Sequence, residues 1–200
     1  MLKKSAVTGV KIHEIIQNRW SPRAFDADKA VKHEDLLALL EAARWAPSCF
    51  NDQPWRFVVS NKENDEAAWA NALTTIVEKN RLWAKNAPVL ILVGAMENFR
   101  HNEQPNRWAG YDAGAASVSL CLQASALGLI AHQMGGFSAE KAREVFNLPA
   151  DFNPIAMIAV GYQAEVDVLD ESFKEAEASV RSRLPLNEVF YAGQWGKGVE

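Results

Sequence analysis

The sequence predicts a single α+β domain. Segments with the apolar spacing of helices alternate along the chain with short runs that have the composition of strands. No repeat, low-complexity stretch or Pro/Gly/Ser-rich linker divides the 200 residues, so one domain is expected over residues 1–200. A doubly wound nucleotide-binding fold shows a similar alternation. However, the chain has no Gly-x-Gly-x-x-Gly after its first strand and no Gly-x-x-x-x-Gly-Lys-Ser/Thr.

The first half of the chain contains four expected elements. Leu36, Leu40 and Ala43 recur on one helical face, and Pro47 ends that helix. The run Val89-Leu90-Ile91-Leu92-Val93 is apolar at every position, which predicts a strand that is buried on both faces. The expected elements are a helix at 33–46, a strand at 55–60, a polar helix at 63–85 and a strand at 89–93.

The second half begins with a polar loop at 97–106 and a helix at 108–128 that is rich in small residues. This helix has a single charge, Asp112, and so resembles a membrane span. Its serines and alanines lower its hydropathy, so a buried helix of a water-soluble protein is the better interpretation. The remaining expected elements are a strand at 129–134, a turn at 135–136, a helix at 139–146, a strand at 155–161 and a C-terminal extension at 162–200.

Composition argues against several classes of protein. A net charge of -4 and a pI near 5.6 argue against a general affinity for nucleic acid or anionic membranes. The only cysteines are Cys49 and Cys121, with no Cys-x-x-Cys and no histidines at ligand spacing, so neither a disulfide framework nor a metal site is expected. The N-terminus lacks the apolar core of a signal peptide, and a cytoplasmic protein is expected.

The segment from Pro47 to Trp55 is the most informative motif. Pro47 and Pro54 restrict the backbone, so the amides of Asn51 and Gln53 are held on a stiff connector between a helix and a strand. Such a display suits a planar ligand with carbonyl and ring-nitrogen edges. The alternative is an ordered turn whose amides bind only local backbone groups.

Two arginine pairs are candidates for anion binding. Arg19, Ser21 and Arg23 alternate on a segment expected to be extended, which points their side chains the same way. Arg181 and Arg183 also lie two positions apart, just before a proline. Guanidinium groups match the geometry of phosphate, although isolated pairs of this kind are also common on solvated surfaces.

A glycine pair, Gly135-Gly136, follows the strand that ends near His132. Without side chains, these residues let backbone N–H groups approach a flat ring, but an ordinary turn has the same composition. Nucleophilic catalysis by Ser48 or Cys49 with His132 as base is a further reading. It lacks the Gly-x-Ser-x-Gly elbow that would support it.

Taken together, these motifs resemble the FMN-dependent nitroreductase family from about residue 19 to residue 186. The matching segments are Arg19-x-Ser21-x-Arg23-x-Phe25, Pro47-Ser48-x-x-Asn51-x-Gln53-Pro54-Trp55, the approach from Asn80 to Pro88, Leu127-Gly128-Leu129, the Gly136-Phe137 turn and Arg181-x-Arg183. The resemblance implies a central mixed, mainly antiparallel sheet flanked by helices. It also implies an intertwined homodimer in which the extension at 162–200 packs on the partner subunit.

The resemblance further implies a role for each candidate residue. Phosphate binding falls to Arg19, Arg181 and Arg183, and contacts with the ribityl chain and pyrimidine edge fall to Ser21 and Arg23. The remaining flavin contacts fall to Asn80, to the N–H groups of Gly135 and Gly136, and to Pro47, Ser48, Cys49 and Asn51 of the partner subunit. Neither a catalytic side chain nor a metal is implied. Several better-known members have an acidic residue in place of Gly135, so their substrate specificity does not transfer to this chain.

The implied activity is the reduction of nitroaromatics, quinones or related electron-poor acceptors by NADH or NADPH. Hydride would pass through flavin N5 in a ping-pong cycle, with FMN bound at the dimer interface. Two alternatives stay open: an FMN-binding module without efficient turnover, and a flavin-consuming or dehalogenating enzyme of the same fold. The sequence does not distinguish NADH from NADPH and does not identify the physiological acceptor.

Overall fold

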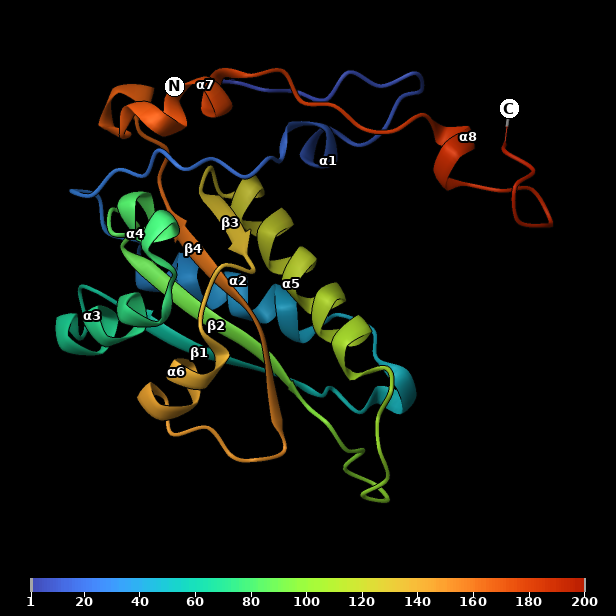
Figure 1. Cartoon of the computed structure of the whole chain (residues 1–200), viewed down its shortest axis with the longest axis horizontal. Coiled ribbons are helices and arrows are strands. Elements are labelled where there is room, and N and C mark those ends of the chain that lie inside the picture. The colour runs from blue at the N-terminus through green and yellow to red at the C-terminus, as the bar shows by residue number, and fades with distance from the viewer. Residues whose placement is uncertain (1, 200) are drawn as a thin grey trace.

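The computed structural model describes residues 2–199, and its centre is a four-stranded sheet (Figure 1). The strands β1 (Trp55–Asn61), β2 (Val89–Met96), β3 (Ile130–Met134) and β4 (Phe152–Gly161) lie in the order β1-β2-β4-β3. All three pairings of these strands are antiparallel. The predicted α+β fold with a mainly antiparallel sheet is confirmed. The strands of one chain, within the described residues, form no parallel pair that would make the sheet mixed.

The central strand β2 is buried on both faces, as predicted from its apolar run. Val89, Ile91 and Val93 belong to one core, whereas Leu90 and Leu92 belong to a second core on the opposite side of the sheet. Because successive side chains of a strand point to opposite faces, a single apolar run supplies both cores. The sheet is therefore the middle layer between two layers of helices.

Two groups of helices cover the sheet (Figure 1). The first core lies between the sheet and the pair α2 (His33–Arg44) and α5 (Ala109–Ala126). The second lies between the sheet and α3 (Glu66–Thr75), α4 (Glu78–Ala84) and α6 (Ala139–Val145). The small residues of α5 allow close packing against the sheet and α2. Within residues 2–199, no helix combines the length and hydropathy needed to cross a membrane.

The single helix predicted at 63–85 is wrong, because α3 and α4 are separate helices. The break is at Ile76, whose backbone is extended and forms a bridge with Phe137. Next to it, the N–H of Val77 donates to the carbonyl oxygen of Gly136 at 3.0 Å. These pairings with a distant turn replace the helical hydrogen bonds that the local pattern favoured.

The predicted start of the last strand is also wrong. β4 begins at Phe152 rather than at Ile155 and runs through Pro154, which has no N–H to donate. The pairing with β2 shifts register between Val93 and Gly94, so Pro154 lies opposite Gly94 at an irregularity. A bulge of this kind tolerates a proline inside a strand.

The two ends of the chain run along one edge of the body (Figure 1). Here lie α1 (Glu14–Asn18), a 3-10 turn η2 (Val166–Val168) and α7 (Glu171–Ala178), which buries Phe173 on its own chain. Beyond α7 the chain leaves the body and reaches α8 (Leu186–Val189). Val180 is 86% exposed and Trp195 is 87% exposed, so this part of the chain has apolar side chains that nothing in the described chain covers.

Candidate functional site

The predicted arginines form a cluster between α1 and the segment that follows α7. Arg19 is the residue after α1, and its Nη1 donates to Ser21 Oγ at 3.3 Å. Arg181 Nη1 donates to the carbonyl oxygens of Lys4 and Gln17, at 2.7 and 2.9 Å. The structure thus brings the N-terminal and C-terminal arginine motifs together across more than 160 residues of sequence.

The electrostatics of this cluster identify it as a candidate anion site. Burial lowers the pKa of Arg181, and the positive charges of Arg19 and Arg183 lower it further. Burial also lowers the pKa of Lys4. The negative charge of Glu177 raises this pKa in part, whereas the positive charges of Arg181 and Arg23 lower it further. A chain with a net charge of -4 has therefore gathered several cations in one place. An anionic group of a ligand would relieve their mutual repulsion.

Arg23 is held differently from the other arginines, through Glu177 of α7. The backbone N–H of Arg23 donates to Glu177 Oε1 at 2.8 Å, and its Nη1 lies 3.7 Å from Glu177 Oε2. The guanidinium also lies over the ring of Phe173, 5.9 Å from the centroid. Sequence reasoning missed Glu177, because one carboxylate on an otherwise polar helix carries no recognisable pattern.

His132 supports the segment that carries these residues. Its Nδ1 lies 3.0 Å from the carbonyl oxygen of Pro22, and because a carbonyl only accepts, Nδ1 must carry the proton. The imidazole packs against Trp83 of α4, with 4.6 Å between ring centroids. His132 is therefore a polar side chain whose hydrogen bond is made within the protein.

His132 should make stability depend on pH. Burial lowers its pKa from 6.5 to about 4; the hydrogen bond to Pro22 raises it in part, and Arg23 and Arg19 add to the lowering. The unfolded state binds the proton more tightly than the folded state. The contribution of neutral His132 to the free energy of unfolding is therefore fully present above pH 6.5 and is lost as the pH drops towards 4. The expected loss is about 3 kcal/mol.

Urea unfolding of the wild type and of His132→Gln at pH 7.5 and pH 4.5 measures this loss. The variant should lose clearly less stability than the wild type between the two values. His33→Gln, which alters an exposed histidine, serves as the control and should keep the wild-type dependence. Equal losses in all three proteins would assign the pH dependence to other groups.

The glycine turn after β3 and Asn80 of α4 lie together, as the predicted roles require. Asn80 Nδ2 donates to the carbonyl oxygen of Gly136 at 3.4 Å. A Cβ added to Gly136 would collide with the Asn80 amide, whereas one added to Gly135 would have no atom within 4 Å. Gly135 therefore faces open space. Gly135 lies about 10 Å along the strand from His132, at roughly 3.3 Å per strand residue.

The Pro47–Trp55 loop is fixed by its own side chains, and η1 (Cys49–Asn51) lies within it. Gln53 Nε2 donates to the backbone oxygen and to Oδ1 of Asn51, at 3.0 and 3.1 Å. Ser48 Oγ accepts from the Gln53 N–H at 3.0 Å. Gln53 thus holds the loop in shape. Phe50, Asn51 and Gln53 have φ of 53°, 53° and 51°, which costs of order 1–3 kcal/mol each for non-glycine residues.

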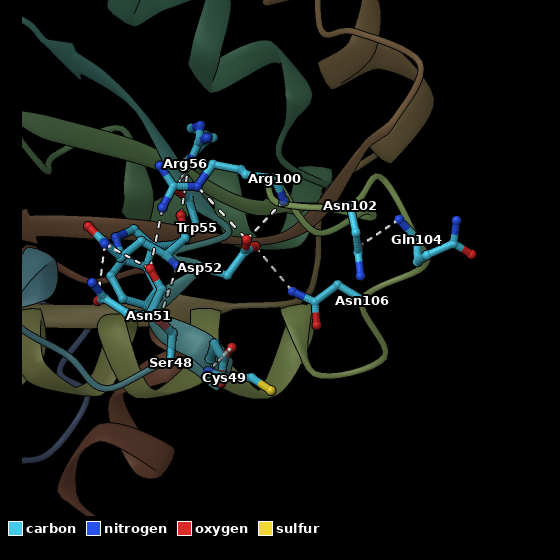
Figure 2. A network of polar contacts seen from close by, with 12 residues as sticks. Ser48, Cys49, Asn51, Asp52, Trp55, Arg56, Arg100, Asn102, Gln104 and Asn106 are labelled. Carbon is cyan, nitrogen blue, oxygen red and sulfur yellow. Dashed lines mark hydrogen bonds and ion pairs between the residues drawn. The ribbon is translucent and has the colours of Figure 1, made fainter.

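A buried carboxylate ties this loop to the hairpin at 97–106 (Figure 2). Asp52 is 3% exposed; its Oδ1 accepts from the backbone N–H of Arg100 at 2.9 Å and its Oδ2 from Asn106 Nδ2 at 3.4 Å. The hairpin in turn packs Phe99 against the ring of Phe50, with 5.9 Å between centroids. Sequence reasoning missed Asp52 and Phe50, since neither residue type stands out beside the two amides.

Two groups of predicted residues are anchored near opposite ends of α5, whose course is seen in Figure 1. The Cys49 N–H donates to Asp112, in the first turn of α5, whereas Arg19 lines a pocket with Ser125, in the last turn. Thirteen residues of helix span about 20 Å. The group near Arg19 contains Ser21, Arg23, Arg181 and Arg183, and the other contains Pro47, Ser48, Cys49 and Asn51. Asn80, Gly135 and Gly136 lie together at the end of β3.

The part of the chain that the structure describes contains no group of three or more His, Cys, Asp and Glu side chains placed to hold a metal ion.

Known proteins share this fold. The structure of an oxidoreductase containing FMN superposes with a TM-score of 0.88 at 37% identity, covering 96% of each chain. A Desulfovibrio desulfuricans protein solved in complex with FMN gives a TM-score of 0.70 at 28% identity, covering 90% of this chain and 95% of its own. The oxygen-insensitive NADPH nitroreductase of Helicobacter acinonychis is 27% identical over 210 residues, which are 90% of this chain and 95% of that protein.

A family model supplies the most direct assignment. The model described as Nitroreductase family matches residues 16–162, well over half of the chain. The matched region includes Arg19, the Pro47–Trp55 loop and the glycine turn after β3. The chain therefore belongs to the nitroreductase family.

Proposed function

We propose that the protein is an FMN-dependent oxidoreductase that takes electrons from NADH or NADPH and passes them to nitroaromatics, quinones or related electron-poor acceptors. Family membership supports the oxidoreductase class. Relatives described as containing FMN or as an NADPH nitroreductase support the cofactor and the co-substrate. When bound, FMN supplies the two-electron chemistry, and the protein supplies binding, orientation and electrostatics.

The residues present fit FMN, and the arginine cluster is the observation that carries this proposal. The positive charges of Arg19 and Arg183 both act on Arg181, and three neighbouring guanidinium groups suit a phosphate group. Gly135 opens onto free space at the end of β3, where a side chain would obstruct a flat ring. Ser21 and Arg23 flank Pro22, whose carbonyl oxygen accepts a hydrogen bond from His132. The donor set therefore matches a ligand with an anionic end and a planar end.

We also propose a homodimer in which the Pro47–Asn51 loop of each chain completes the site of its partner. Within one chain, Cys49 and Arg19 are anchored near opposite ends of α5, about 20 Å apart, which favours a site that takes its arginines from one chain and its loop from the other. Exposed surface supports the assembly: Gly110, Gly114 and Val118 form an open stripe along α5. The arm from Val180 onward carries uncovered apolar side chains that we propose pack on the partner.

One experiment tests the cofactor and the electron donor together. The purified protein should be yellow, or become yellow on addition of FMN, and should elute as a dimer in light-scattering chromatography. Without oxygen, NADH or NADPH should bleach the flavin absorbance, and a quinone or nitroaromatic should restore it. A yellow protein that neither nucleotide bleaches would support a binding module instead. A colourless protein that FMN cannot reconstitute would overturn the proposal.

A further inference from the structure

The buried carboxylate of Glu177 is the only acidic side chain that contacts the arginine cluster within the described residues. It is 1% exposed and comes from α7, outside the region that the family model matches. Its Oε1 accepts from the backbone N–H groups of Arg23 and Ala24, at 2.8 and 3.3 Å. One carboxylate oxygen thus fixes two successive peptide groups of a segment more than 150 residues away.

The second oxygen of this carboxylate is directed to the Arg23 side chain. Oε2 is buried, has no hydrogen-bond partner in the described chain, and lies 3.7 Å from Arg23 Nη1. That separation is an ion pair without a hydrogen bond. Desolvating a carboxylate costs several kcal/mol, so this arrangement requires the charge of Arg23 close by. The guanidinium of Arg23 also lies over the ring of Phe173, which is one turn earlier on α7.

Glu177 is also joined to the N-terminal part of the cluster. The backbone oxygen of Glu177 accepts from Lys4 Nζ at 2.8 Å, and Lys4 in turn offers its own backbone oxygen to Arg181. A single turn of α7 therefore connects Arg23, Lys4 and Arg181. The preorganisation of a charged group lowers the entropic cost of binding a ligand to it.

We propose that Glu177 is a positioning residue, which holds Arg23 in the orientation needed to bind the flavin. This inference rests on the proposed FMN site and adds to it a contribution from the C-terminal helix. Electrostatics alone predict the opposite effect, because a negative charge beside an anion site weakens anion binding. The sign of the change on removing the charge therefore distinguishes positioning from simple repulsion.

The test measures FMN affinity by titrating the apoprotein and following the quenching of flavin fluorescence. Glu177→Gln keeps an oxygen for the Arg23 N–H but removes the charge opposite the guanidinium. We expect FMN binding to weaken about tenfold, the change typical of one charge-assisted interaction. Glu175→Gln makes the same charge change on the exposed face of α7 and should bind as the wild type does.

A double-mutant cycle shows whether Glu177 acts through Arg23. Arg23→Gln should itself weaken FMN binding, and adding Glu177→Gln to it should change the affinity by less than about twofold. The tenfold loss should also persist in 0.5 M salt, since a contact at this range is screened little. Additive losses, or tighter binding in Glu177→Gln, would overturn the proposal.

Two further results keep the test decisive. If Glu177→Gln proves too unstable to assay, Arg23→Met takes its place, and wild-type FMN affinity in that variant would overturn the proposal. If the wild type itself does not bind FMN, the proposed function has failed. A wild type that binds FMN while Glu177→Gln binds equally well rejects only the positioning role.

Discussion

Replacing Arg19 with glutamine is expected to weaken FMN binding about 100-fold, which corresponds to about 2.7 kcal/mol. Arg19 is well suited to this change, because its only side-chain hydrogen bond described within the chain goes to Ser21 Oγ. Arg181, by contrast, also ties together Lys4 and Gln17, and its loss would disturb the fold. Isothermal titration of the apoprotein with FMN measures the effect.

The matched control for this change is Arg107→Gln, which removes an exposed arginine outside both groups of site residues. Both variants should unfold at temperatures near that of the wild type. If Arg19→Gln binds FMN with wild-type affinity, or if Arg107→Gln loses as much affinity, the arginine cluster is not the phosphate site.

The glycine pair after β3 should separate the requirements of the fold from those of the ligand. Gly136→Val is expected to lower the free energy of unfolding by about 2 kcal/mol, because the new side chain would collide with Asn80 and with Val77. A Cβ at Gly135 meets no protein atom within 4 Å, so Gly135→Val should fold normally. It should nevertheless lose most of its FMN affinity, because its side chain fills the space proposed for the ring.

Urea unfolding of the apoproteins and FMN titration together measure this difference. Gly9→Ala, at a glycine in the N-terminal segment with free space around it, provides the reference for a neutral glycine substitution. Should Gly135→Val bind FMN as tightly as the wild type, the open space beside Gly135 would not be part of the flavin site.

Local patterns predicted most of the fold, because they reflect what each segment buries. The apolar run of β2 and the spacing in α2 were sufficient, since a fully buried strand and an amphipathic helix have distinct periods. The pattern failed at Ile76, where pairing with Phe137 interrupts a helix, and at Pro154, where a register shift admits a proline. Both features depend on residues distant in sequence, so no local window contains them.

In the candidate site, short motifs revealed some residues, whereas others were revealed only by contacts between distant parts of the chain. The predicted residues were recognised from short motifs, and the structure collects them into two groups rather than one. The residues that hold them in place, such as Glu177, Asp52 and His132, act through contacts that cross the chain. A lone carboxylate or histidine in a sequence does not reveal its partner, so these supports became visible only in three dimensions.

The position of the two groups at opposite ends of α5 has a genetic consequence for the proposed dimer. Each site would draw its arginines from one chain and its loop from the other. A chain with a defective arginine cluster and a chain with a defective loop would therefore complement one another, because their mixed dimer contains one intact site. The helix α5 then acts as the spacer that holds the arginines and the loop of one chain about 20 Å apart.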